Sequence, residues 1–308
     1  MSSGSSGHVA RSTVRPHCET TGRAPLRTPS RTFLRASDGV TIDAVYDPGA
    51  AVYDASRTPA GHPVFVVAHG FTGAVDRPHV RRVAQAFARY GAVVTFSFRG
   101  HGASGGRSTV GDREVLDLAA AVRWARELGH ARVATVGFSM GGSVVLRHAA
   151  LYGEYGGAGE YGGAGEYGGA EEEYGDAGEG TDVVVSVSAP ARWYYRGTAP
   201  MRRLHWLVTR PEGRVVGRYG FRTRIHHRDW NPVPLSPVEA VPRIAPTPLL
   251  IVHGDADGYF PVDHPRMLAA AAGDQGELWL EPGMGHAEHA ASDDLLGRIG
   301  EWVVGRAG

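Results

Sequence analysis

Residues 133–150 read VATVGFSMGGSVVLRHAA, and this stretch decides the fold. It opens with a β-branched run, passes through Gly137-Phe-Ser139-Met-Gly141 and continues as an apolar segment, which predicts a strand, a sharp turn and a helix in that order. Glycines must flank a serine on such a turn because neighbouring backbone approaches it closely. The amino end of the following helix favours negative charge. The stretch predicts that Ser139 is a nucleophile; the alternative is a serine that only caps a helix.

A second serine has the same five-residue spacing, in Gly102-Ala-Ser104-Gly-Gly106. No helical pattern begins at Ser104, and Arg99, His101 and several glycines surround it, which is typical of a loop. We therefore interpret Ser104 as part of a glycine-rich connection and not as the nucleophile.

Apolar or β-branched runs alternate with helical patterns along most of the chain. A first hairpin is predicted from residues 32–36 and 41–46, which flank the turn-forming Ser37-Asp38-Gly39. Buried parallel strands are predicted for residues 63–68, 93–97, 132–136, 182–188, 248–253 and 277–280. Apolar residues recur at helical spacing in residues 80–87, 115–122 and 295–303. This alternation predicts one α/β domain, residues 32–304, with a mostly parallel, doubly wound sheet.

Three segments depart from this alternation. Residues 1–31 are rich in Ser, Gly, Arg and Thr, which predicts a disordered leader whose first seven residues resemble an expression linker. Residues 153–180 repeat Gly-Glu-Tyr-Gly-Gly-Ala and then become acidic, which predicts a disordered insert. Residues 190–237 are aromatic, arginine-rich and interrupted by prolines, and we interpret them as a lid inserted over the active site.

Composition excludes several classes of function. The formal net charge is zero and the pI is about 7.3, so there is no global attraction to nucleic acid. The chain contains no lysine, which excludes Schiff-base lysines, Ser-Lys dyads and the phosphate-binding P-loop. Cys18 is the single cysteine, so no intrachain disulfide can form. No apolar run reaches the roughly 18–20 residues of a membrane span, and the leader has no secretory apolar segment. We expect a cytoplasmic protein.

Histidines near acidic residues raise the hypothesis of a metal site. His286, Glu288 and His289 are close in sequence, and His226 is followed by His227. Such pairs alone are weak indications of metal ligation. We interpret them as ordinary polar loop residues and expect neither a metal nor a cofactor.

The other parts of a serine-hydrolase site follow predicted strands. His69-Gly-Phe71-Thr-Gly73 comes directly after residues 63–68, where a second backbone N–H can converge with that of Met140 to form an oxyanion hole. Two carboxylates, Asp255 and Asp257, follow residues 248–253, and His286 lies in a glycine-rich loop after the last strand. Serine, acid and histidine therefore occur in the order typical of one class of hydrolase.

With these residues in place, the chain resembles the α/β-hydrolase superfamily from Thr32 to Val304, in particular its small esterase, lysophospholipase and serine-aminopeptidase-like members. The motifs that carry the resemblance are His69-Gly-Phe71, the loop 98–104, the Ser139 turn, His253-Gly with Asp257 and Pro261, and Gly285-His286. One departure is Ser97, where the family usually has an aspartate two residues before the arginine of this loop.

The resemblance implies the α/β-hydrolase fold and a mechanism. Ser139 attacks an acyl carbon, His286 takes its proton, Asp257 holds the imidazole tautomer, and the Phe71 and Met140 amides bind the oxyanion. We therefore predict a serine hydrolase that cleaves a small acyl ester. A thioesterase, an aminopeptidase-type amide hydrolase, a cofactor-free haloperoxidase, a C–C bond hydrolase and a non-catalytic binding protein remain alternatives on the same fold.

The predicted lid also indicates a preference among substrates. Residues 191–230 contain ten arginines and only two acids, Glu212 and Asp229. Arginine binds carboxylate and phosphate groups well, so we predict that the lid favours substrates that are anionic or presented at an anionic interface. The alternative is that arginine, in a chain without lysine, only solvates the surface. An apolar acyl pocket is predicted from Trp193, Tyr194, Tyr195, Trp206 and Trp230.

Overall fold

An eight-stranded sheet runs through the part of the chain that the computed structural model describes, namely Met1 and residues 28–49, 62–153 and 178–307. The strand order is β1-β2-β4-β3-β5-β6-β7-β8. β1 and β2 form an antiparallel hairpin, β2 pairs antiparallel with β4, and all pairs from β4 to β8 are parallel. The strands are β1 (Ser30–Arg35), β2 (Thr41–Asp47), β3 (Val64–Ala68), β4 (Ala92–Phe96), β5 (Val133–Phe138), β6 (Val183–Val187), β7 (Leu249–Gly254) and β8 (Gly276–Glu281).

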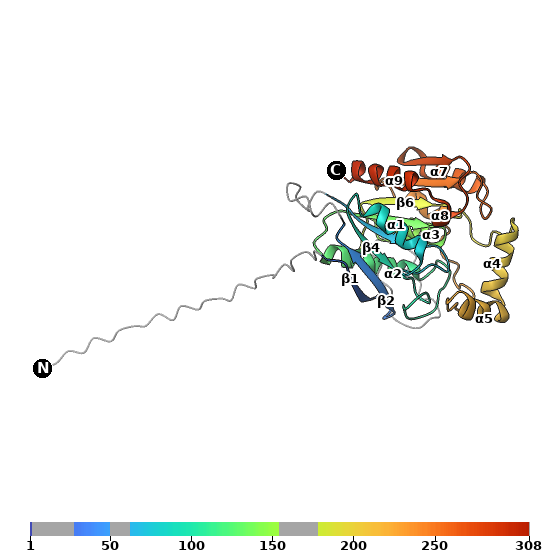
Figure 1. Cartoon of the computed structure of the whole chain (residues 1–308), viewed down its shortest axis with the longest axis horizontal. Coiled ribbons are helices and arrows are strands. Elements are labelled where there is room, and N and C mark those ends of the chain that lie inside the picture. Colours follow the sequence, from blue (N-terminus) through green and yellow to red (C-terminus); the bar gives the residue numbers. More distant parts are fainter. Residues whose placement is uncertain (2–27, 50–61, 154–177, 308) are drawn as a thin grey trace.

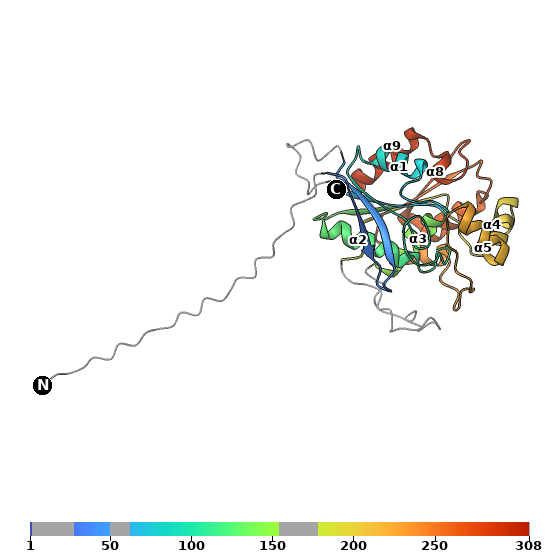
Figure 2. The ribbon, with the colours of Figure 1, turned by 60° about the horizontal axis from the view of Figure 1, so that its bottom comes forward.

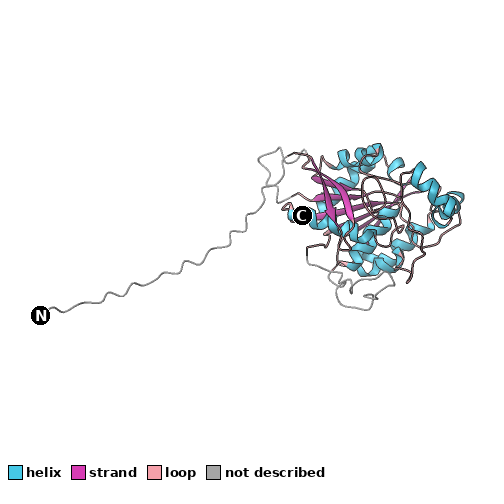
Figure 3. Ribbon diagram, turned by 90° about the horizontal axis from the view of Figure 1, so that it is seen from below, coloured by secondary structure: helices cyan, strands magenta, loops and turns pink. Residues whose placement is uncertain are grey.

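Helices cover both faces of this sheet (Figure 1, Figure 3). On one face α2 (Glu114–Glu127), α3 (Met140–Leu151), α6 (Pro237–Ala240) and α7 (Asp263–Ala272) share a core with the strands. On the other face α1 (Pro78–Phe87), α8 (Ala287–Ala290) and α9 (Asp293–Arg306) form a second core (Figure 2). The central strands β3, β5, β6 and β7 are buried at every residue, which explains why their sequences are mostly apolar or β-branched.

The predicted strands and the predicted doubly wound sheet are confirmed, with ends that differ by one or two residues. β1 begins at Ser30, two residues inside the expected leader, because its pairing with β2 extends to the partners Ser30 and Tyr46. Residues 2–27 of that leader lie outside the described residues. The sheet is therefore slightly longer at this end than the sequence pattern indicated.

Most of the predicted insert, residues 154–177, also lies outside the described residues. Its described flanks meet near the amino end of β5. The Asp182 carboxylate accepts from the Val133 N–H at 2.7 Å, and Gly180 lies against the carbonyl of Tyr152. The last three residues of the predicted insert, 178–180, are described, and Glu179 among them pairs with Arg123.

Residues 190–237, hereafter the cap segment, leave the sheet after β6 and return at α6. They contain α4 (Ala199–Thr209) and α5 (Pro211–Gly220), which stand apart from the layers at one end of the molecule (Figure 1, Figure 2). Two isolated β-bridges, His101 with Thr223 and Ser108 with Ile225, attach the segment to the loops that follow β4. Among the described helices, none is both long and apolar enough to cross a membrane.

Candidate active site

Ser139 occupies the sharp turn between β5 and α3. Its φ of 52° and ψ of −112° lie outside the regions that residues with a side chain favour, at a cost of roughly 1–3 kcal/mol. A Cβ on Gly137 would lie 2.2 Å from the Gly141 carbonyl oxygen, and one on Gly141 would lie 2.1 Å from that of Ala68. These two glycines therefore permit the backbone crossing that presents Ser139 at the carboxyl end of the sheet.

Ser139, His286 and Asp257 lie in one hydrogen-bonded chain. His286 Nε2 is 2.9 Å from Ser139 Oγ, and His286 Nδ1 is 2.8 Å from Asp257 Oδ2. The three residues follow β5, β7 and β8, whose carboxyl ends meet at one edge of the sheet. An imidazole between a hydroxyl and a carboxylate can take the hydroxyl proton while the carboxylate holds its orientation.

The surroundings of Asp257 keep its carboxylate ionised. Burial alone would raise the pKa of this group, but hydrogen bonds from His286 and from the N–H groups of Tyr259 and Phe260 hold the pKa below its ordinary value. Asp255 faces elsewhere and accepts from the Gly283 N–H at 2.6 Å. Of the two candidate acids, the structure brings Asp257 and not Asp255 to His286.

Residues that the sequence did not single out fix the loop of His286. Tyr259 stacks on the imidazole with ring centroids 4.2 Å apart. Ala287, the next residue, has a φ of 55°, and its N–H donates to Ser188 Oγ at 3.1 Å. Ser188 itself has a φ of 54°. Nothing in the local sequence marks Ser188, because its partner is 99 residues away.

The loop His69–Gly73, predicted to supply one oxyanion amide, lies beside the nucleophile. A Cβ on Gly70 would lie 3.4 Å from Ser139 Cβ. Phe71 and Met140, which carry the two predicted amides, both line the cavity at Ser139. The loop and the turn therefore lie side by side at the cavity, and the two oxyanion amides stay a prediction.

Two buried histidines hold this loop and its neighbour. His69 Nδ1 donates to the Gly70 carbonyl at 2.6 Å, while its Nε2 accepts from the Phe98 N–H at 3.0 Å. His101 Nε2 accepts from the Thr72 N–H at 3.2 Å. Burial lowers the pKa of both imidazoles, so each stays neutral and can use one nitrogen as an acceptor.

The hydroxyl group of Ser104 is engaged in hydrogen bonds with the backbone. This group is fully buried, accepts from the Asp43 N–H at 2.9 Å and donates to the Ser97 carbonyl at 2.5 Å. Ser97, which departs from the family pattern, uses its own hydroxyl to accept from the Val75 N–H at 3.1 Å. A serine at position 97 therefore still ties the loops after β3 and β4 together.

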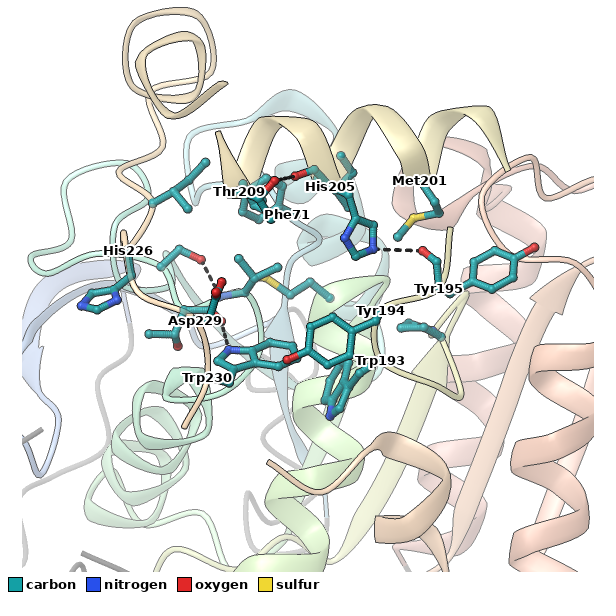
Figure 4. A pocket seen from close by; sticks show the side chains of 18 of the residues that line it. Phe71, Trp193, Tyr194, Tyr195, Met201, His205, Thr209, His226, Asp229 and Trp230 are labelled. Carbon is teal, nitrogen blue, oxygen red and sulfur yellow. Dashed lines mark hydrogen bonds between the residues drawn. The ribbon is translucent and has the colours of Figure 1, made fainter. Parts of the chain in front are cut away.

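A cavity of about 610 Å³ lies between the cap segment and Ser139. Trp193, Tyr194 and Trp230 lie on one side of it, and α4 lies across from them (Figure 4). Tyr195 also lines the cavity, as predicted. The prediction was wrong for Trp206, which is 48% exposed and is not among the lining residues, because it faces away on α4.

The histidines considered as metal ligands contact a serine or other histidines. His286 belongs to the hydrogen-bonded chain above, the rings of His226 and His227 lie 5.0 Å apart at the cavity, and His289 packs against His79. Within the described ranges, no three His, Cys, Asp or Glu side chains gather as a metal site requires.

Known proteins that are similar to this chain are described as a lipase, an esterase and a hydrolase. A family model described as the alpha/beta hydrolase fold matches residues 63–155. A monoacylglycerol lipase of Mycolicibacterium smegmatis is 28% identical over 287 residues, which is 86% of this chain and 94% of that protein. An esterase of Pyrococcus furiosus superposes with a TM-score of 0.62 at 20% identity, covering 91% of this chain and 93% of its own. An α/β serine hydrolase without a lid from Xanthomonas campestris has a TM-score of 0.55 at 19% identity, with coverage of 92% and 95%.

Proposed function

We propose that the chain, which has the α/β-hydrolase fold, is a serine hydrolase that cleaves a carboxylic ester through Ser139, His286 and Asp257. The observation that carries the proposal is the chain of hydrogen bonds from Ser139 Oγ through both nitrogens of His286 to Asp257, at 2.9 and 2.8 Å. The same side chains on a non-catalytic binding protein would have no reason to share this geometry on a strained turn.

The reaction begins when Ser139 Oγ attacks the ester carbonyl carbon and its proton passes to His286 Nε2. The charge that develops on the carbonyl oxygen is bound by the amides of Phe71 and Met140. His286 then protonates the leaving alcohol, and the acyl group stays on Ser139. A water molecule, deprotonated by His286, attacks this acyl-enzyme and releases the acid.

The cavity favours a substrate with an apolar acyl group. Trp193, Tyr194 and Trp230 present large apolar surfaces to it. The indole N–H groups of the two tryptophans already donate to backbone carbonyls, Trp193 to Pro234 and Trp230 to Thr109. A volume of about 610 Å³ is that of a site for a small molecule. The relative described as a monoacylglycerol lipase supports a small lipid ester rather than a polymer.

The proposal is tested with a fluorophosphonate probe and a panel of p-nitrophenyl esters of increasing acyl length. We expect rapid labelling of the wild-type protein, and ester turnover that the Ser139→Ala variant lowers by about 10⁴-fold or more. Thioester and aminoacyl-amide substrates in the same panel would identify the alternative activities.

Ser104→Ala is the matched control. We expect it to keep most of the ester activity but to lower the free energy of unfolding by about 1–3 kcal/mol, since the buried Asp43 N–H loses its acceptor. If the probe instead labelled Ser104, or labelled Ser139→Ala as fast as the wild type, the proposed nucleophile would be wrong.

A further inference from the structure

Glu288 has a buried carboxyl group that the proposed reaction does not use. It lies on α8, two residues after His286, and is 4% exposed. Its Oε1 accepts from the Gly70 N–H at 3.0 Å, across 218 residues of sequence. Arg82 fixes the backbone here by donating to the carbonyl oxygens of Glu288 and Ala291 at 2.8 and 2.7 Å. The carboxyl group is thus held in place beside the loop His69–Gly73.

Gly70 is in contact with both Glu288 and the nucleophile. A Cβ at this position would lie 3.1 Å from each carboxyl oxygen of Glu288 and 3.4 Å from Ser139 Cβ. A side chain at this position would be in tight contact and would require Glu288 or Ser139 to shift by a few tenths of an ångström. Glycine also has the widest backbone freedom, so an outside contact is needed to fix its orientation.

The three contacts to this loop determine the direction of the Phe71 N–H. Each peptide unit is rigid and planar, so holding one atom of the unit orients the others. Glu288 holds the peptide unit between residues 69 and 70 by accepting the Gly70 N–H. His69 holds the unit between residues 70 and 71 through the Gly70 carbonyl, and His101 holds the unit between residues 71 and 72 through the Thr72 N–H. The Phe71 N–H belongs to the middle unit, opposite the carbonyl that His69 binds.

His79 also lies near the Glu288 carboxyl group, but farther from it than the Gly70 N–H. His79 Nε2 is 3.8 Å from Glu288 Oε1, beyond hydrogen-bonding distance. Burial and the adjacent His289 lower the pKa of His79, and the two rings pack with centroids 3.9 Å apart. A neutral imidazole at that distance does not compete strongly for the carboxyl oxygen.

We propose that Glu288 is a positioning residue for the oxyanion hole: by accepting the Gly70 N–H, it holds the loop so that the Phe71 N–H faces the substrate carbonyl oxygen. The inference rests on the proposed ester hydrolysis. The position of the Glu288 acceptor oxygen and the charge of its carboxylate have opposite effects. A negative charge close to the developing oxyanion opposes it, so the benefit of Glu288 comes from its acceptor atom and not from its charge.

Three variants separate these contributions. Glu288→Gln keeps an acceptor oxygen at the same reach without the charge, and we expect kcat within about threefold of the wild type. Glu288→Asp keeps the charge but withdraws the oxygen by one methylene, and Glu288→Ala removes it. For both we expect kcat to fall by about 10- to 100-fold with KM changed less than about twofold, because one oxyanion donor is misdirected. Glu281→Ala is the control: it removes a carboxylate at the end of β8 that pairs with Arg298, and it should keep the wild-type kcat.

A second measurement uses the same hole without turnover. A trifluoromethyl ketone adds to the nucleophile and leaves an oxyanion, so its affinity should fall in Glu288→Asp and Glu288→Ala by the same factor as kcat/KM and remain unchanged in Glu288→Gln. Thermal unfolding of each variant shows that the chain is folded, and Glu288→Asp and Glu288→Gln remain informative if Glu288→Ala is not.

Two results would overturn the positioning role: Glu288→Asp equal to the wild type in kcat and ketone affinity, or Glu288→Gln as impaired as Glu288→Ala. Failure of the proposed function looks different. In that case the wild-type protein itself is neither labelled by the fluorophosphonate nor inhibited by the ketone.

Discussion

Asp255 and Asp257 stand two residues apart after β7, yet their carboxyl groups have different partners. Asp257 binds His286 and two backbone N–H groups, whereas Asp255 binds the Gly283 N–H at the base of the neighbouring loop. At the scale of single residues, the hydrogen-bond partners and not the residue type decide which of two equal side chains can orient the base.

The exchange of each acid for its amide should therefore give unequal defects. In Asp257→Asn the amide can stabilise the wrong imidazole tautomer, so we expect kcat for ester hydrolysis to fall by about 10³- to 10⁴-fold. Asp255→Asn keeps an oxygen that can accept from Gly283, and its kcat should stay within a few-fold of the wild type. Steady-state kinetics on one ester checks both, and a larger defect in Asp255→Asn would reverse the assignment.

The sequence locates these residues because each follows a strand whose pattern is easy to recognise. Ser139, Asp257 and His286 are such residues, and the structure brings their side chains together. Glu288 and Ser188 could not be found in this way. Their roles depend on contacts across 218 and 99 residues, which no local spacing encodes.

At the scale of elements, the cap segment carries an unusual combination of surface residues. Trp206, Val215, Val216 and Phe221 are between 43% and 57% exposed, and Tyr219 is 75% exposed. Arginines are interspersed among them, and Arg192, Arg196, Arg214 and Arg228 line the cavity. Some of these charges are already engaged, since Arg192 pairs with Asp263 at 2.9 Å and Arg214 donates to the Thr209 carbonyl at 2.9 Å.

The excess of arginine predicts a preference for anionic esters that salt weakens. Between about 0.02 and 0.5 M ionic strength, kcat/KM for a p-nitrophenyl hemisuccinate should fall by roughly 3- to 10-fold, while that of a neutral ester of equal length stays constant. Arg196→Gln, at the cavity, should reduce this difference, and Arg203→Gln, outside the lining residues, should not. Equal salt dependence for both esters would leave the arginines as surface solvation.

The sequence does not predict which side of α4 in the cap segment faces the cavity. The composition of the segment predicted an insertion over the site, and four of the five aromatic residues assigned to the cavity do line it. Trp206 does not, because α4 turns Met201, Leu204 and Val208 toward the cavity and leaves Trp206 48% exposed, so apolar residues occur on both sides of the helix. Which side faces inward depends on how the helix rests on the sheet edge.

At the scale of the whole molecule, several buried or partly buried histidines are uncharged. Burial lowers the pKa of His148 to about 3, and those of His130 and His264 to about 4. In the unfolded chain the same imidazoles titrate near their ordinary pKa of about 6.5. Below that pH the unfolded state binds more protons than the folded state, so stability is present above about pH 6.5 and is lost as the pH falls toward 4.

His148 provides the cleanest test because it is completely buried and stacks on Tyr152. His148→Phe keeps an aromatic ring but cannot take up a proton. We expect the free energy of unfolding of the wild type to fall by about 2 kcal/mol more than that of the variant between pH 7 and pH 5. Urea titrations at several pH values measure this, with the exposed His227→Phe as the control for loss of an imidazole. Parallel curves for the wild type and His148→Phe would contradict the expectation.

The meeting of Tyr152 and Gly180 at the amino end of β5 has a consequence for how the chain can be engineered. Six residues of β5 separate this place from the nucleophile turn, a length of about 20 Å. Replacement of residues 154–177 by a short glycine linker, with Glu179 retained for its pairing with Arg123, should therefore leave kcat and KM unchanged. A fluorescent domain spliced in at the same place should be tolerated equally well, and ester kinetics of the fusion protein would show it. We therefore expect this place, at the end of β5 away from Ser139, to accept an inserted domain without a change in ester hydrolysis.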